Sequence, residues 1–486
     1  MEKQAETAGR ARGGRGRRAL VAAVMGCAVL GGALALWPWQ RSAVRPPLAP
    51  APGAQALTAV TAGVPAALPG LATLIGEREA LLRTHPGDAR SWAVLGAAYV
   101  EQGRRTADAG NYPRAEKALR TSLNVRPQKN AAALDGLAAL ANARRDFRTA
   151  RAWGEASLKL DAGRWTAYPP LIDAYTGLGD YKAAKRTLDR LLELQGGAAV
   201  QGVAAAVYRD RGYREDAAAA LSDAAAAAAQ PAEQAAYLER AGQLAWERGD
   251  PAEALRLFQA AVRLDPDQRA AQAGQGRTLA ALGRTTEALN AYRVALDKQP
   301  CPRYALELGE LYESLGLAQA ARVEYDLLRT RAAHDAAGGM DDELVLGIFE
   351  ADHGDARTAV RRLRAEWQRQ PGIEVADALG WALHRAGDDK QALKYATIAT
   401  DRAHGGGVRS APYSYHRGMI ERGLDLTAPA RRHLQEALRI NPYFSPLAVP
   451  PARRALAALG EPPDEPVPTG TPGRDDEDGK AHRQPR

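Results

Sequence analysis

A short pattern of small residues, an aromatic residue and proline recurs along this chain about every 34 residues, and it limits the fold more than any other feature. The clearest copy runs from residue 235 to residue 267 and keeps its positions in this order: Leu238, Gly242, Gly249-Asp250, Ala254, Phe258, Ala261 and Asp265-Pro266. One copy is too short to bury an apolar face alone, so copies that return in phase must stack on one another.

Further copies keep the same order of positions with different degrees of completeness. They are marked by Trp92, Leu95-Gly96, Tyr99, Ala115 and Pro127; Tyr175, Gly179-Asp180 and Ala184; Gly276, Gly283, Ala288, Tyr292 and Pro300; Leu308-Gly309, Gly316 and Tyr325; Gly347, Gly354-Asp355 and Pro371; Leu379-Gly380, Gly387-Asp388 and Ala392; and Gly418, Ala430 and Asn441-Pro442. Weaker copies lie near residues 137–162 and 201–229, and the first copy carries about seven extra residues around Arg105 to Asn111. The sequence therefore predicts nine or ten copies.

Each recurring position has a physical role in a pair of antiparallel helices. Small residues such as Gly242 and Ala254 let the two helices approach closely. Gly249 can adopt the positive φ that ends a helix, and Asp250 can cap the start of the next one. Proline after the second helix prevents its continuation, and an aromatic residue such as Phe258 packs against the neighbouring copy.

On these residues the chain resembles the tetratricopeptide repeat (TPR) family, from Leu71 to about Gly460. The resemblance implies an all-α fold in which residues 71–460 form an α-solenoid, a right-handed superhelix of about nine to ten helix pairs. It also implies a concave groove, lined by the first helices, that binds peptides, extended segments or other domains. The matching positions are structural, so they imply the fold and not a particular ligand.

The N-terminus has the pattern of a membrane signal anchor. Residues 1–18 are basic, with five arginines between Arg10 and Arg18, and an uncharged run follows. The part from Ala19 to Trp37 is long enough for one transmembrane helix. The positive-inside rule predicts a cytoplasmic N-terminus and an extracytoplasmic array. A cleaved signal peptide is the alternative, because Ala33-Leu34-Ala35 resembles a small-residue cleavage site.

Two further segments read as non-repeat sequence. Residues 38–70 contain seven prolines among alanines and predict a stiff, extended spacer. Residues 461–486 are rich in proline, glycine and charge, which predicts a disordered tail.

The sequence offers no set of residues typical of catalysis or metal binding. It has no P-loop, no His-Glu-x-x-His and no Gly-x-Ser-x-Gly, and its eight histidines are scattered. The two cysteines, Cys27 and Cys301, form no metal motif. Charges of both signs alternate along the predicted helices, which is typical of a solvated surface and not of a nucleic-acid site. We therefore expect no enzyme, no cofactor, no metal and no small-molecule substrate, but a protein or peptide partner.

The candidate contacts for that partner lie on the predicted first helices and face the groove. They are Gln243, Trp246, Arg277, Glu310 and Glu313. Trp246 and Arg277 are the strongest candidates, because exposed tryptophan and arginine dominate binding energy at interfaces. The alternative for both is that they only pack against, or solvate, their helices.

Three hypotheses on function follow. The first is a membrane-anchored TPR scaffold that faces outside a bacterial cell and recruits envelope proteins through its groove. The second is a substrate-docking or assembly subunit of an envelope enzyme or transporter complex. The third is a secreted soluble binding protein that is released when the signal is cleaved.

Overall fold

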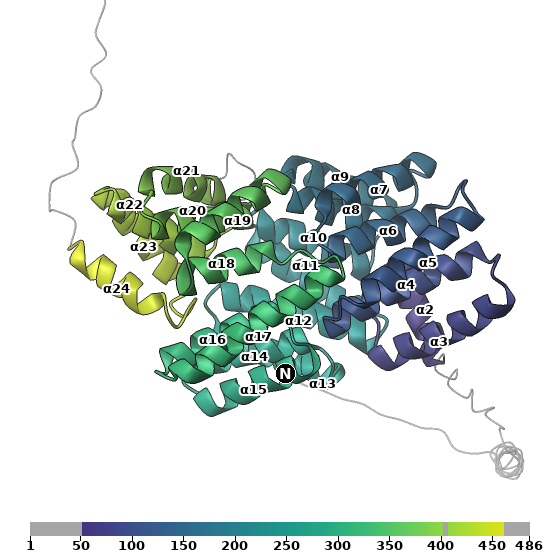
Figure 1. Cartoon of the computed structure of the whole chain (residues 1–486), viewed down its shortest axis with the longest axis horizontal. Coiled ribbons are helices and arrows are strands. Elements are labelled where there is room, and N and C mark those ends of the chain that lie inside the picture. Colours follow the sequence, from purple (N-terminus) through teal and green to yellow (C-terminus); the bar gives the residue numbers. More distant parts are fainter. Residues whose placement is uncertain (1–50, 402–406, 461–486) are drawn as a thin grey trace, which may run out of the picture. The chain divides into compact units, whose positions relative to one another are not determined.

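A computed structural model of the chain describes residues 51–401 and 407–460, which are coloured in Figure 1. These residues form 23 α-helices and one short 3₁₀ helix, and they contain no strand. The all-α prediction is confirmed for this part of the chain. The basic segment 1–18, the predicted anchor 19–37 and the tail 461–486 lie outside the described residues. Within the described residues, none of the helices combines the length and the apolar character needed to cross a bilayer.

Twenty of the helices form ten consecutive antiparallel pairs, numbered here from pair 1 to pair 10. Their bounds are α4 (Ala89–Thr106) and α5 (Asn111–Val125); α6 (Ala131–Ala143) and α7 (Phe147–Leu160); α8 (Tyr168–Gly177) and α9 (Tyr181–Leu194); α10 (Ala198–Asp210) and α11 (Arg214–Ala227); α12 (Pro231–Glu247) and α13 (Pro251–Leu264); α14 (Arg269–Ala281) and α15 (Thr285–Lys298); α16 (Pro302–Ser314) and α17 (Ala318–Ala337); α18 (Glu343–His353) and α19 (Ala356–Arg369); α20 (Ile373–Arg385) and α21 (Asp389–Thr400); α22 (Ala411–Gly423) and α23 (Thr427–Ile440). The short 3₁₀ helix η1 (Trp165–Ala167) precedes α8, and α24 (Val449–Ala458) packs on pair 10.

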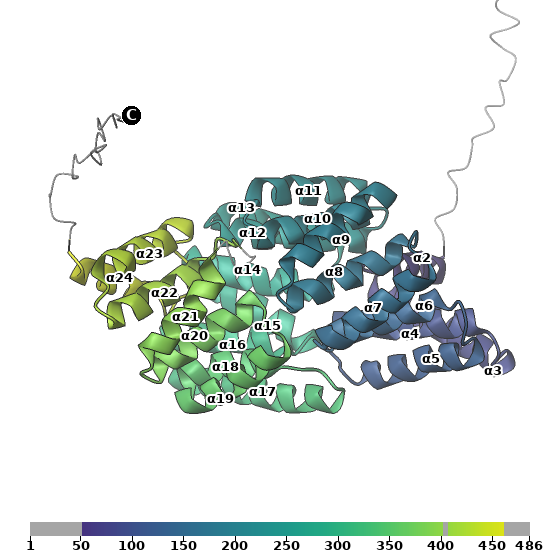
Figure 2. The same ribbon diagram turned by 90° about the horizontal axis from the view of Figure 1, so that it is seen from above.

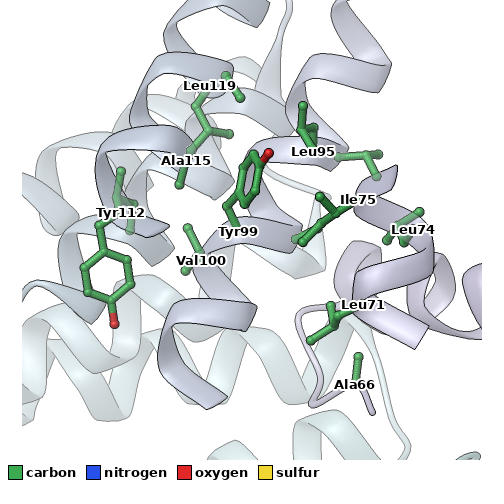
Figure 3. Packing of buried hydrophobic residues seen from close by; sticks show 14 of the residues in the cluster. Ala66, Leu71, Leu74, Ile75, Leu95, Tyr99, Val100, Tyr112, Ala115 and Leu119 are labelled. Atoms are coloured by element: carbon green, nitrogen blue, oxygen red, sulfur yellow. The ribbon is translucent and has the colours of Figure 1, made fainter. Parts of the chain in front are cut away.

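The array begins earlier than the sequence predicts. Helices α2 (Pro52–Ala62) and α3 (Leu68–Thr84) pack on each other and on α4, so the prediction of an extended spacer over 38–70 is wrong from residue 52 onward. Pro52 stands at the first turn of α2, where its missing N–H costs nothing, and alanines supply the buried face. Figure 3 shows Leu71, Leu74 and Ile75 in one cluster with the side chains of pair 1.

The turn between the two helices of a pair follows from two adjacent residues. Gly179 and Gly249 have φ of 72° and 82°, the left-handed region that glycine enters without steric cost. The next residue caps the second helix, as the Asp250 side chain does by accepting a hydrogen bond from the backbone N–H of Glu253 at 3.0 Å. Gly354 is the exception to the predicted positive φ, because its φ is −132°, although Asp355 still caps α19.

The aromatic residue of the second helix lies between two first helices, as the sequence predicts. Phe258 is fully buried, and a Cβ added at Gly242 or at Gly274 would lie within 3.0 Å of its ring. Gly242 belongs to the same pair and Gly274 to the next, so one ring packs against both. Ala254, predicted at a close helix contact, is fully buried as well.

First helices form the inner side of the array. Neighbouring first helices contact one another, as α4 does with α6, α12 with α14 and α18 with α20. A row of helix pairs must curve toward the side on which its helices are closer. The pairs follow one another from α3 to α24, which lie at opposite ends in both views (Figures 1 and 2).

The array winds back on itself after five pairs, and we call the resulting line of contacts the seam. Along the seam, the turn inside one pair meets the loop that follows the pair five places later. Ile373 donates its backbone N–H to the hydroxyl of Tyr181 at 3.2 Å, and the Asn441 amide donates to the Trp246 carbonyl at 2.8 Å. The residues in the second contact are 195 positions apart in the chain.

The extra residues predicted in the first copy are part of this seam. They lengthen α4 to 18 residues, against 13 in α6 or α10, and they form the loop to α5. The Gln299 amide donates to the Arg104 carbonyl, and the Arg331 guanidinium donates to the Ala107 carbonyl, both at 3.1 Å. The insertion therefore closes the first contact of the seam.

Candidate functional site

The inner face of pairs 4 to 7 is held by one continuous hydrogen-bonded network. The Arg277 guanidinium on α14 donates to Gln243 Oε1 on α12 at 2.7 Å and to both carboxylate oxygens of Glu307 on α16 at 3.0 and 3.1 Å. Gln243 in turn donates to Glu247, which pairs with Arg209 of α10 at 2.6 Å. We call these residues the arginine tie, because they join four inner helices.

The charges of the arginine tie stabilise each other although burial opposes them. Burial works against the charge of Arg277, but the Glu307 carboxylate outweighs it and raises the pKa of Arg277 further. Burial likewise opposes the charge of Glu307, and Arg277 outweighs it, so the pKa of Glu307 is lowered. Both groups therefore stay ionised at neutral pH, and Arg277 has few donors left for a ligand.

The prediction that Trp246 is an exposed anchor is wrong. Its side chain is 6% exposed and lies in the core of pair 5, because the residue is on the side of α12 that faces α13. The Arg277 guanidinium lies 5.8 Å from the centre of its ring, so the two predicted anchors contact each other. Trp246 therefore fits the alternative given above, in which the residue packs inside the fold and does not bind a partner.

Glu310 and Glu313, the other predicted contacts, bind a histidine that the sequence analysis did not select. His353 of α18 places Nε2 3.4 Å from Glu310 Oε1 and Nδ1 3.2 Å from Glu313 Oε2. Tyr325 donates its hydroxyl to Glu313 at 2.8 Å and stacks near the imidazole, with ring centres 4.6 Å apart. The sequence around His353 shows only a Gly-Asp turn, in which Asp355 caps α19, and it gives no sign of the contact with the two glutamates.

A second histidine takes a similar position between α20 and α22. His416 Nδ1 lies 2.9 Å from the Asp377 carboxylate, and its ring stacks on Trp381 with centres 4.4 Å apart. Trp381 donates its indole N–H to Asp352 at 2.8 Å. We call the His353 and His416 sites the histidine clamps, since each joins inner helices of different pairs.

The pKa of each histidine is raised in the clamps. Burial opposes the imidazolium at both sites. The neighbouring carboxylates outweigh it: Glu310, Glu313 and Asp352 act on His353, and Asp377 and Asp352 act on His416. Both rings are therefore held toward the charged form, in which each nitrogen carries a proton.

Three carboxylates of the inner face have no hydrogen bond or ion pair among the described residues. They are Asp173 of α8, Glu239 of α12 and Glu374 of α20. Loss of water around the inner face raises the pKa of Asp173 and Glu239. Burial raises the pKa of Asp210 to about 6, and the negative charge of Glu374 raises it as well.

A cleft of about 170 Å³ opens beside Glu239, where the turn of pair 1 meets pairs 5 and 6. It is lined by side chains of both signs, among them Glu101, Arg104 and Arg240. Arg240 has no ion pair there, although its charge acts on Asp173 and Glu101. No group of three potential metal ligands lies together in the described part of the chain. The cleft can therefore receive charged side chains of a polypeptide, but it shows no arrangement for bond-breaking chemistry.

Residues 203–269, 240–300 and 273–336 match the sequence profile of a family described as tetratricopeptide repeat. The chain contains tetratricopeptide repeats. The match spans pairs 4 to 7, where the repeat spacing is regular and no insertion interrupts it. All five predicted contacts, and every residue of the arginine tie, lie on the repeats that the profile covers.

Solved structures of similar architecture include yeast Tom70, human IFIT1 (a dimer with PPP-AAAA) and YrrB, a TPR protein with an unusual peptide-binding site. Tom70 shares 13% identity at a TM-score of 0.34, over 75% of this chain and 96% of its own. IFIT1 shares 14% at 0.41, over 75% and 85%, and YrrB shares 22% at 0.26, over 38% and 93%. No curated protein matches the chain in sequence. These scores are too low to carry an argument on function.

Proposed function

We propose that this chain is a non-catalytic scaffold whose inner face binds an extended, basic segment of a partner protein. The observation that carries the proposal is the set of unpaired carboxylates Asp173, Glu239 and Glu374. They lie on three different inner helices, while the neighbouring arginines of the arginine tie are bonded to protein partners.

Asp173 and Glu374 are exposed and Glu239 is half-buried, so a ligand can reach all three, and a cation that it brings can form charge-assisted hydrogen bonds with them. Lysine and arginine side chains of an extended segment, spaced along the inner helices, fit this requirement. The tied Arg277 holds the helices in place and does not compete for the ligand. We therefore assign partner binding to these carboxylates and not to Trp246 and Arg277.

We further propose that the array is held at a membrane, outside the cytoplasm. The support is the sequence from Ala19 to Trp37, which has the length and apolar character of a membrane helix behind an arginine-rich segment. Fractionation with N-terminal sequencing tests this point. An intact N-terminus in the membrane fraction supports the anchor, whereas a mature chain that begins near Leu36 and is free in the medium contradicts it.

Site-specific photo-crosslinking tests the inner face directly. A photoreactive residue at position 239 should crosslink a partner in cells, and the same residue at position 323, on the exposed outer side of α17, should not. Crosslinks of equal yield from both positions would show that the inner face is not the binding surface. Charged segments in the peptides recovered from position 239 would also identify the partner's chemistry.

A further inference from the structure

The seam covers only half of the turns in the array. The turns of pairs 1 to 5 meet the loops that follow pairs 6 to 10, and no helix pair among the described residues meets the turns of pairs 6 to 10. A Cβ at Gly179 would lie 2.4 Å from the Pro371 carbonyl oxygen, and one at Gly249 would lie 2.7 Å from that of Ile440. At Gly283 and Gly316 nothing lies within 4 Å of the same point. These later turns are therefore free, with the same glycine geometry.

Two of the five free turns carry an exposed leucine at the N-cap position, whereas Asp355 and Asp388 cap the second helix in two others. Leu317 and Leu426 stand at the N-caps of α17 and α23, make no capping hydrogen bond, and are 48% and 41% exposed. Asp180 and Asp250 occupy the same position in covered turns and cap their helices. An apolar residue at an N-cap costs roughly 1 kcal/mol relative to aspartate. Leu282 and Leu315, which precede the turn glycines, are exposed as well.

The opposite edge of the array has a matching set of apolar residues. The last residue of α23, Ile440, lies at the seam and is 5% exposed. The last residue of α7, Leu160, has the same place in pair 2, whose loop meets no turn, and it is 49% exposed. Val125, at the end of α5, is also exposed. Ile440 is thus buried where a turn covers it, whereas Leu160 and Val125 are exposed where no turn does.

We propose that the free turns of one copy bind the free loops of a second copy, so that the seam continues from chain to chain. The occupant is a second copy of this chain, because the contact repeats an interface that the array already makes with itself. The two edges differ, so the contact is heterologous and does not close into a symmetric dimer. Copies therefore add end to end, and the assembly grows with concentration.

Sedimentation velocity of the full chain in one detergent, over a hundredfold range of concentration, tests the proposal. The expected result is a mass that rises in multiples of the 51.8 kDa chain. The double variant Leu317→Asp/Leu426→Asp should stay a single copy at every concentration. Its melting temperature should not fall, because aspartate is the better N-cap. The matched control Val294→Asp/Val323→Asp, on exposed positions of the outer helices, should associate like the natural chain.

A mixing experiment separates the two edges. A copy with Leu317→Asp/Leu426→Asp keeps only its loop edge, and a copy with Val125→Asp/Leu160→Asp keeps only its turn edge. Each variant alone should remain a single copy, and the mixture of the two should form pairs and no larger assembly. The proposal would be overturned by a natural chain that remains a single copy at all concentrations. It would also be overturned if the Leu317→Asp/Leu426→Asp variant associated as well as the natural chain. A mixture that forms no pairs would overturn the matching of the two edges.

Discussion

The arginine tie and the histidine clamps join inner helices in the same way but respond to pH in opposite directions. Arg277 is charged at every pH in the physiological range, so only its partner Glu307 titrates. In the clamps the histidines titrate, with pKa values that the neighbouring carboxylates raise. One scaffold thus contains a middle section fixed by permanent charge and a C-terminal section whose contacts depend on protons.

The largest expected effect is loss of the arginine tie. Arg277→Ala leaves the Glu307 carboxylate in a poorly solvated position without its bidentate partner, and we expect a loss of about 3 kcal/mol in the free energy of unfolding. Chemical denaturation measures it. Arg303→Ala is the matched control, because Arg303 lies 3.5 Å from the same carboxylate but its side chain is well exposed, so the change should stay below about 0.5 kcal/mol. Equal losses in both variants would contradict the distinction.

Loss of a clamp should cost less. His353→Leu keeps the packing against Tyr325 and Phe349 but leaves Glu310 and Glu313 facing each other without a cation. We expect a loss of about 1–2 kcal/mol at pH 6, measured by the same denaturation. His85→Leu, at an exposed helix end, serves as the control and should change little. If His353→Leu lowered the free energy of unfolding no more than His85→Leu does, the clamp would not stabilise the fold.

The pH dependence has the smallest effect and separates the two regions most clearly. The pKa values of His353 and His416 are raised above 6.5, so their contribution is complete below that pH and is lost as the pH rises through the raised values. The pKa of Glu307 is lowered below 4.5, so its contribution is complete above that pH and is lost on acidification. Hydrogen exchange, corrected for intrinsic rates, should show α18 to α22 loosening in alkaline solution and α12 to α16 in acid.

Much of the fold was predictable because its causes are local. Gly249 and Asp250 fix a turn by themselves, and Phe258 needs only the glycines of two adjacent first helices, so the spacing of such residues indicates the pairs. Helix α2 escaped prediction because its one proline, Pro52, lies at the helix start, which the Pro-rich composition of residues 38–70 conceals.

The seam and the clamps were not predictable for a different reason. The seam joins residues about 195 positions apart through backbone carbonyls, such as that of Trp246, and a carbonyl leaves no mark on the residue type. His353 depends on two carboxylates of another pair, Glu310 and Glu313. The sequence placed these carboxylates on the inner face but gave no reason to connect them with a histidine.

Charge reversal on the inner face tests the central claim most directly. The full chain with Asp173→Lys, Glu239→Lys and Glu374→Lys should lose the partners that the natural chain captures from cells, as quantified by mass spectrometry. Glu215→Lys, Asp223→Lys and Asp297→Lys make the same change of charge on exposed positions of outer helices and should keep those partners. Equal capture by the two triple variants would contradict a binding surface on the inner face.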